Sequence, residues 1–291
     1  MTWKRVATAV VLIPFVVGLV LWGSTAMVAV GMALVILLAL FEFFALGEAI
    51  GHRAYRFWTA TCALLLVFVQ WEAAKGPPEP LAYSVDRIIG IGGTIFTAPT
   101  AADVFFVFLL GVTALTLWTK RPMVEALPAA GISSSGLLLI ALPLTFAILL
   151  HGIGTFGPPL LLFVLVITWI GDTAAYFVGR TIGKHKLAPV LSPNKTWEGT
   201  IASLIGALLV AVLFARWINI PLPHLLGMAA AGNVAGQAGD LFESAFKRSA
   251  GVKDSGTLLP GHGGVLDRID ALILAIPVVW YYWIWIYLPN R

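Results

Sequence analysis

Charged residues are scarce in this chain. They make up 11% of its 291 residues, whereas hydrophobic residues make up 59%, and 11 positions are tryptophan. A soluble domain carries about 25% charged residues, because its surface has to face water. The composition therefore excludes an ordinary soluble domain and indicates an integral membrane protein.

Cysteine is almost absent as well. Cys62 is the single cysteine, so the chain cannot form an intrachain disulfide. The sequence also lacks an internal repeat of fixed period and any low-complexity tract. The missing repeat weakens the interpretation as a transporter built from inverted repeats.

Long apolar runs are abundant. A helix needs about 20 residues to cross the hydrocarbon core of a bilayer, and all its backbone groups are hydrogen-bonded within the segment. The sequence predicts an all-α, polytopic fold with about nine transmembrane helices, of which the glycine-containing eighth is the weakest. The predicted spans are Val6–Trp22, Ala26–Ala49, Phe57–Trp71, Val104–Trp118, Gly136–Leu150, Leu160–Val178, Ile201–Trp217, Leu225–Leu241 and Ala271–Leu288. We expect the first to be an uncleaved helix, with a cleaved signal peptide as the alternative.

Lysine and arginine predict the orientation, because positive charge is retained on the cytoplasmic side during insertion. Nine spans with the N-terminus inside leave only Lys75, Arg87, Arg216 and Arg291, of 18 Lys and Arg residues, on the outer side. We therefore expect an integral cell (inner) membrane protein whose active site faces the cytoplasm.

The two halves of the chain differ in character. Residues 1–150 contain apolar spans without a cluster of reactive groups and are interpreted as an N-terminal transmembrane scaffold. Residues 151–291 are interpreted as a C-terminal transmembrane catalytic region. Glu42, near the inner end of the second span, is interpreted as an interfacial or interhelical hydrogen-bonding group, since a carboxylate there needs water or a partner. The Pro- and Gly-rich outer loop 72–102 has no function that the sequence indicates.

Half of the 14 acidic residues lie between positions 171 and 270, interleaved with Lys and Arg. Such charge density beside apolar spans is costly, and an ionic substrate explains it. A first polar block begins at Asp172, which shares a helix face with Tyr176; pairing of Asp172 with a distant cation is the structural alternative. A second block, Ser192–Gly199, precedes a helix and suits a phosphate, or else it is a capped helix entry with Lys195 at the lipid headgroups.

The third block, 239–270, carries the clearest pattern. Asp240, Glu243, Ser244 and Lys247 follow i, i+3, i+4, i+7 spacing and form one polar stripe on a helix. A Gly- and Pro-rich loop follows, and then Asp267, Arg268 and Asp270 lead into the last span. Carboxylates from two elements suit a divalent cation that also binds substrate phosphates. A salt-bridge network at the headgroups is the structural alternative.

These residues resemble the signature of the phosphatidate cytidylyltransferase family, also called CDP-diacylglycerol synthases. The signature has the form S-x-x-K-R-x4-K-D-x5-(P/G)-x-H-G-G-x-x-D-R-x-D. It is filled here by Ser244, Lys247, Arg248, Lys253, Asp254, Pro260, His262, Gly263, Gly264, Asp267, Arg268 and Asp270. The resemblance implies an enzyme that transfers CMP from CTP to phosphatidic acid, giving CDP-diacylglycerol and pyrophosphate.

The resemblance also implies roles for individual residues. The residues expected to be catalytic are Asp240, Lys247, Arg248, Lys253, Asp267 and Arg268. Those expected to bind substrate are Asp172, Ser192, Asn194, Lys195, Thr196 and His262. Asp240, Asp267 and Asp270 are expected to bind Mg²⁺, with Asp254 as a helper and a second cation left open. Expected partners are CTP, phosphatidic acid, membrane lipids and, by resemblance only, a second copy of the chain; nucleic acid is not expected.

Two other functions are alternatives. A related CTP-using membrane enzyme could act on an isoprenyl lipid, since acyl and isoprenyl chains are both apolar. An ion-coupled transporter would need ionisable residues near the midplane of spans in both halves, whereas here they cluster at inner ends in one half.

Overall fold

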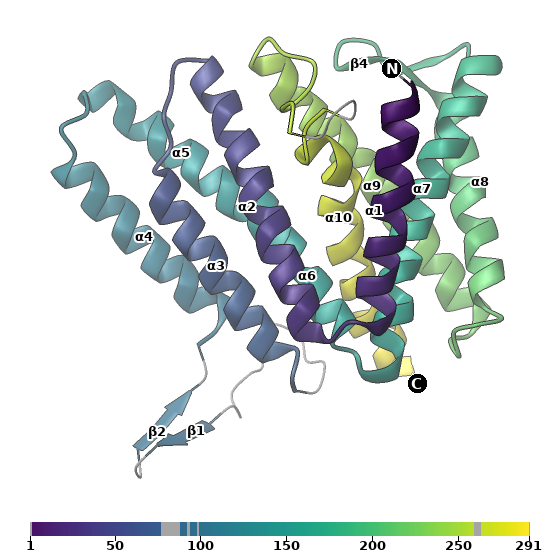
Figure 1. Ribbon diagram of the computed structural model, residues 1–291, viewed down its shortest axis with the longest axis horizontal. Helices are drawn as coiled ribbons and strands as arrows, with labels where there is room; N and C mark the ends of the chain where they lie inside the picture. The colour runs from purple at the N-terminus through teal and green to yellow at the C-terminus, as the bar shows by residue number, and fades with distance from the viewer. Residues whose placement is uncertain (1, 77–87, 92–93, 98, 259–262, 291) are drawn as a thin grey trace.

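The computed structural model describes residues 2–76, 88–91, 94–97, 99–258 and 263–290, and over these residues it is a bundle of long helices (Figure 1). The first half of the chain forms α1 (Thr2–Trp22), α2 (Thr25–Ala49), α3 (Arg56–Ala73), β1 (Ile88–Ile91), β2 (Thr94–Thr97), α4 (Ala101–Trp118), α5 (Ala126–Gly136) and α6 (Leu142–His151). The second half forms α7 (Gly157–Thr181), β3 (Lys186–Ala188), β4 (Ser192–Thr196), α8 (Trp197–Phe214), α9 (Leu222–Ser249) and α10 (Leu266–Tyr282).

The prediction of an all-α polytopic fold is confirmed. Six helical stretches in the described part of the chain are long and apolar enough to cross a membrane: α2, α4, Met123–His151, Gly154–Thr181, α8 and Leu266–Tyr287. The described apolar part of α1 is shorter, and α3 and α9 run beside these stretches without meeting the same criterion. The count of nine crossings therefore stays a prediction.

The fifth predicted span is part of a longer helical stretch. It includes a π-helical turn, Leu137–Ala141, which joins α5 to α6 just before Pro143. Proline has no N–H to donate to the helix ladder, and a π turn accommodates such a break.

The polar connections gather at one end of the bundle. In Figure 1 the antiparallel β3–β4 hairpin lies at the end that holds the start of α1, and the antiparallel β1–β2 hairpin lies at the opposite end. The two chain ends also lie at opposite ends of the bundle, as an odd number of crossings requires. The β1–β2 hairpin belongs to the loop 72–102 that is predicted to be outer, and the β3–β4 hairpin belongs to a segment predicted to be inner. Their positions at opposite ends of the bundle agree with that prediction.

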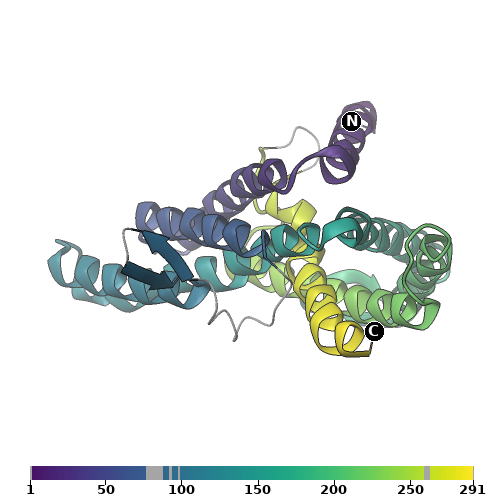
Figure 2. The ribbon, with the colours of Figure 1, turned by 90° about the horizontal axis from the view of Figure 1, so that it is seen from below.

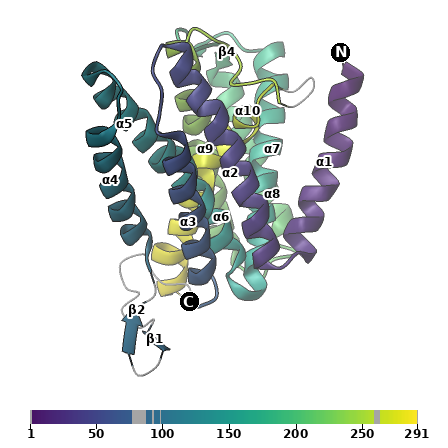
Figure 3. The same ribbon diagram turned by 60° about the vertical axis from the view of Figure 1, so that its left-hand side comes forward.

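Two cores of buried apolar side chains hold the helices together. One is formed mainly by α6, α7, α8, α9 and α10, and it includes Val20 at the end of α1. The other is formed mainly by α2 to α6, and it includes Leu266 and Ile273 of α10. Since α6 and α10 contribute to both cores, they join the two halves of the chain. Seen from below and from the side, the start of α1 leans away from its neighbours (Figures 2 and 3).

The outer surface of the bundle is apolar. Phe57 is 92% exposed and Trp118 is 81% exposed, and many aliphatic side chains of α1, α4 and α8 are exposed as well. In water such a surface would aggregate, whereas in a bilayer it contacts lipid tails.

Glycines bring α9 and α10 close together. A Cβ added at Gly239 would lie 2.6 Å from the backbone oxygen of Asp270, and one added at Gly236 would lie 3.4 Å from that of Ala271. Small residues permit such close approach of membrane helices. The glycines that weaken the eighth span as an apolar run are thus the residues that pack it against the last helix.

This packing predicts that Gly239→Ala lowers the thermal stability of the detergent-solubilised protein, because the added methyl group has to push α10 away. The expected cost is about 1–3 kcal/mol, typical of overpacking. Gly131→Ala in α5 is the matched control, since a Cβ at Gly131 has nothing within 4 Å. Equal melting temperatures for the two variants would contradict this account of the α9–α10 contact.

Candidate active site

A buried lysine joins the polar stripe of α9 to the start of α10. Lys247 Nζ lies 2.5 Å from Glu243 Oε2 and 2.7 Å from Asp267 Oδ1. Glu243 is 3% exposed, so among the described residues the Lys247 ammonium is what balances its charge. Buried charges need such pairing, and here the pairing fixes the two helices relative to each other.

The loop before α10 is folded around Asp267. The backbone N–H of Ser255 donates to Asp267 Oδ1 (3.2 Å) and Oδ2 (3.0 Å), and that of Gly264 donates to Oδ2 (2.8 Å). Gly264 is also where a side chain would collide with the Ser255 hydroxyl. Asp267 therefore organises the glycine-rich segment of the predicted signature as well as facing Lys247.

The second polar block reaches the same place from the other side. Lys195, at the end of β4, has its Nζ 2.6 Å from Asp240 Oδ2 on α9. The Thr196 hydroxyl accepts from the backbone N–H of Gly199 at 3.2 Å and thereby caps α8. The sequence therefore encodes a capped helix entry, and its lysine points at the third block.

Arg248 holds the β3–β4 hairpin in position. Its Nε donates to the Leu191 carbonyl oxygen at 3.1 Å, and its Nη1 donates to the Val252 carbonyl oxygen at 2.8 Å. The family resemblance implies a catalytic role for Arg248; in this structure it links the end of α9 to the loops on either side.

A group of carboxylates stands between α7, α9 and α10. Asp172, Asp240 and Asp270 lie within electrostatic range of one another, and Lys195 and Arg268 act on Asp172 with the opposite sign. Asp172 and Arg268 are exposed, whereas Asp240 and Asp270 are partly buried. Negative charges within electrostatic range of one another favour a cation between them.

The predicted site residues do not all meet in this cluster. The structure brings together Asp172, Lys195, Asp240, Asp270 and Arg268, and beside them Lys247 and Asp267. Thr196 is buried as the cap of α8, Ser192 pairs with Ala188 in the hairpin, and Asn194, Lys253 and Asp254 are exposed. His262 lies outside the described residues.

The residues present suit a magnesium ion in their chemistry. Within the described ranges no group of three or more His, Cys, Asp and Glu residues is arranged to hold a metal ion alone. Magnesium usually takes one or two protein carboxylates and completes its shell with water and substrate phosphates. Asp240 on α9 and Asp267 or Asp270 on α10 supply hard oxygen donors from adjacent helices, which fits that pattern.

Sequence reasoning missed one group that supports this cluster, and it left the partners of another unnamed. Asn233 Nδ2 donates to Ser203 Oγ at 2.9 Å, and Gln237 Nε2 donates to Asn233 Oδ1 at 2.7 Å, so a buried amide network joins α8 to α9. Glu42 of α2 accepts hydrogen bonds from the start of α10. The interpretation of Glu42 as an interhelical hydrogen-bonding group is confirmed. The signal in the sequence was a carboxylate inside an apolar span.

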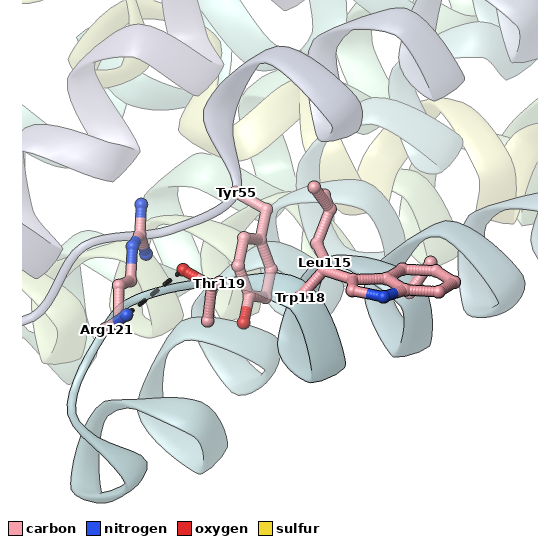
Figure 4. Close-up of a pocket in the computed structure, with 6 residues that line it drawn as sticks. Tyr55, Leu115, Trp118, Thr119 and Arg121 are labelled. Carbon is pink, nitrogen blue, oxygen red and sulfur yellow. Dashed lines mark hydrogen bonds between the residues drawn. The ribbon is translucent and has the colours of Figure 1, made fainter.

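A separate recess near α3 and α4 lacks this chemistry. It has a volume of about 270 Å³ and is lined by Tyr55, Ala114, Leu115, Trp118, Thr119 and Arg121 (Figure 4). Arg121 stacks over the Tyr55 ring at 5.1 Å from its centroid, and its side chain donates to the Arg53 carbonyl oxygen. A lone arginine among aromatic side chains is typical of a membrane interface, so the candidate active site is the cluster at α9 and α10.

Comparison with known proteins agrees with the geometry. The profile of the cytidylyltransferase family matches residues 3–286, nearly the whole chain. This chain belongs to the cytidylyltransferase family. The predicted family is thereby confirmed.

Individual relatives carry a more specific name. A protein of Brucella suis named phosphatidate cytidylyltransferase is 42% identical over 230 residues, which are 75% of this chain and 80% of the relative. Proteins of the same name from Haemophilus influenzae and Staphylococcus saprophyticus are 47% and 49% identical over 133 and 121 residues. Each of these two alignments spans 46% of the relative's length.

The Lys247 bridge predicts a large stability effect for Lys247→Met, because the change leaves Glu243 and Asp267 facing each other without a cation. Breaking a buried ion pair in this way costs about 3–5 kcal/mol, to be measured as a fall in melting temperature in detergent. The double variant Lys247→Met/Glu243→Gln should recover part of the loss, since one carboxylate is then neutral.

Lys195→Met is the matched control for Lys247→Met. Lys195 and Asp240 are 24% and 30% exposed, so water compensates for the missing partner and the cost should be smaller. A Lys247→Met protein as stable as the wild type would show that the bridge does not hold α9 to α10.

Proposed function

We propose that this protein is a phosphatidate cytidylyltransferase of the inner membrane, with its active site on the cytoplasmic side. The observation that carries the proposal is the meeting of Lys195, Asp240, Asp267 and Arg268 at one end of the bundle, in a chain of the cytidylyltransferase family. The names of its relatives support phosphatidate as the acceptor.

The position of the site suits two substrates of unlike solubility. CTP is soluble in water, whereas phosphatidate is anchored in the bilayer with its phosphate at the headgroups. The charged cluster joins Lys195 of the β3–β4 hairpin and Asp267 at the start of α10 to Asp240 in the second half of α9. The hairpin lies at the end of the bundle that also holds the start of α1 (Figure 1). That end is predicted to be cytoplasmic from the distribution of Lys and Arg.

The reaction needs charge neutralisation more than proton transfer. An oxygen of the phosphatidate phosphate bonds to the α-phosphorus of CTP, and the bond from that phosphorus to the bridging oxygen breaks. Pyrophosphate leaves with that bonding pair, and CDP-diacylglycerol remains. The attacking oxygen is already anionic at neutral pH, so no side chain has to act as a strong base.

The cations of the site have distinct environments. Lys195 and Arg268 are accessible at the cluster and are proposed to bind phosphate oxygens of the substrates. Lys253 is exposed in the loop after α9 and is proposed as a further phosphate-binding cation. Lys247, enclosed between Glu243 and Asp267, is proposed to keep those carboxylates in place.

Magnesium is proposed as the cofactor, held by Asp240 together with Asp267 or Asp270. When bound, it would neutralise charge on the triphosphate and favour departure of pyrophosphate. The protein's own contribution is to fix these carboxylates on two helices that the glycines of α9 pack tightly together.

This proposal predicts that purified protein releases pyrophosphate only when CTP, phosphatidate and Mg²⁺ are all present. Asp240→Asn should lower kcat by roughly 10²- to 10³-fold, as expected when one electrostatic element of such a site is lost. Asp103→Asn is the control, because Asp103 caps α4 away from the cluster. The lipid product is identified by mass spectrometry.

The acceptor is tested in parallel reactions with phosphatidate and with a polyprenyl phosphate. A CDP-lipid formed from phosphatidate, and not from the polyprenyl phosphate, supports the proposal. Nucleotidyl transfer to the isoprenyl lipid alone would overturn the substrate assignment, and turnover without any lipid phosphate would overturn the reaction itself.

A further inference from the structure

The first half of the chain contributes a carboxylate to the start of α10. Glu42 lies on α2 and is 2% exposed. Its Oε1 accepts the backbone N–H of Val265 at 2.9 Å, and its Oε2 accepts the backbone N–H of Leu266 at 2.8 Å. The Ser255 hydroxyl donates to Oε2 at 3.0 Å, so three donors converge on one buried carboxylate.

These bonds replace a local helix cap. The first N–H groups of a helix have no partner within it, and the residue before α10, Val265, has no side chain able to accept them. A carboxylate at a helix N-terminus both accepts the bonds and complements the positive end of the helix dipole. Glu42 does this from 223 residues away in the sequence.

The loop leaves room for this carboxylate by means of glycine. A Cβ added at Gly256 would lie 2.6 Å from Glu42 Oε1, and one added at Gly264 would collide with Glu42 Oε2. Gly264 belongs to the predicted signature, so one of its glycines is explained by a residue far outside the signature.

Ser255 connects this carboxylate to the proposed metal-binding one. Its hydroxyl donates to Glu42, while its backbone N–H donates to Asp267. Gly264 likewise donates its N–H to Asp267 beside Glu42. Movement of the α10 start relative to α2 would therefore move Asp267 and the two charged residues after it.

We propose that Glu42 is a positioning residue of the active site, which fixes the start of α10 so that Asp267, Arg268 and Asp270 project correctly. The proposal rests on the function proposed above. It adds a residue of the first half, which the sequence presents only as scaffold, to the machinery that orients the reacting groups.

Glu42→Gln tests the proposal with little change in volume. The amide keeps one acceptor oxygen, but in either orientation its NH₂ group faces a backbone N–H. The amide also lacks the negative charge that the N-terminus of the helix prefers. We expect kcat to fall roughly 10- to 100-fold, as for partners that orient ligating carboxylates, with the KM for phosphatidate nearly unchanged. Glu48→Gln is the matched control on the same helix, because Glu48 pairs with Arg56 at the surface.

Hydrogen–deuterium exchange of the substrate-free protein provides a readout independent of turnover. We expect Glu42→Gln to speed exchange selectively in the segment that contains Gly264, Val265 and Leu266, and Glu48→Gln to leave it unchanged. Should Glu42→Gln not yield folded protein, Ser255→Ala removes only the third bond to Glu42, and a smaller effect in the same segment and on kcat is expected.

The outcomes separate the two proposals. Faster exchange at the start of α10 together with a lower kcat supports the positioning role. Unchanged exchange, or faster exchange with full kcat, overturns it. Lack of pyrophosphate release by the wild-type protein would instead overturn the proposed function, and it is seen before any variant is compared.

Discussion

A carboxylate within a membrane helix bundle has to receive hydrogen bonds or face a cation, because hydrocarbon offers it neither. At the start of α10 this requirement is met for Glu42 by three donors and for Asp267 by Lys247 and two backbone amides. Together these bonds tie three segments to the same helix end. The position of α10 is thereby determined by α2, by α9 and by the glycine-rich loop together.

The rest of the site follows from that fixed helix end. The glycines of α9 allow α10 to approach, and the resulting contact brings Asp240 near Asp270. Lys195 enters from the β3–β4 hairpin, which Arg248 attaches to the end of α9. Ionic groups from four segments thus meet at one end of the bundle, while the lipid-facing surface stays apolar.

Much of this arrangement could be predicted from the sequence, because apolar runs and charge clusters are local signals. The all-α polytopic fold, the polar stripe of α9 and the family all followed from residues close together in the chain. The role of Glu42 could not, since its partners Val265 and Leu266 have no side-chain chemistry that indicates a distant acceptor. The partners of Lys247 and Arg248 could not be predicted either, because a basic residue in a signature suggests phosphate binding. Only the fold shows that Lys247 pairs with carboxylates and that Arg248 donates to carbonyl oxygens.

The most direct test of the account is an experimental structure of the full chain in lipid with CTP and Mg²⁺. The account predicts metal density contacting Asp240 and a carboxylate at the start of α10, with the triphosphate beside Lys195 and Arg268, and with Glu42 still bonded to the N–H groups of Val265 and Leu266. Nucleotide bound elsewhere on the protein, or metal held without Asp240, would contradict it.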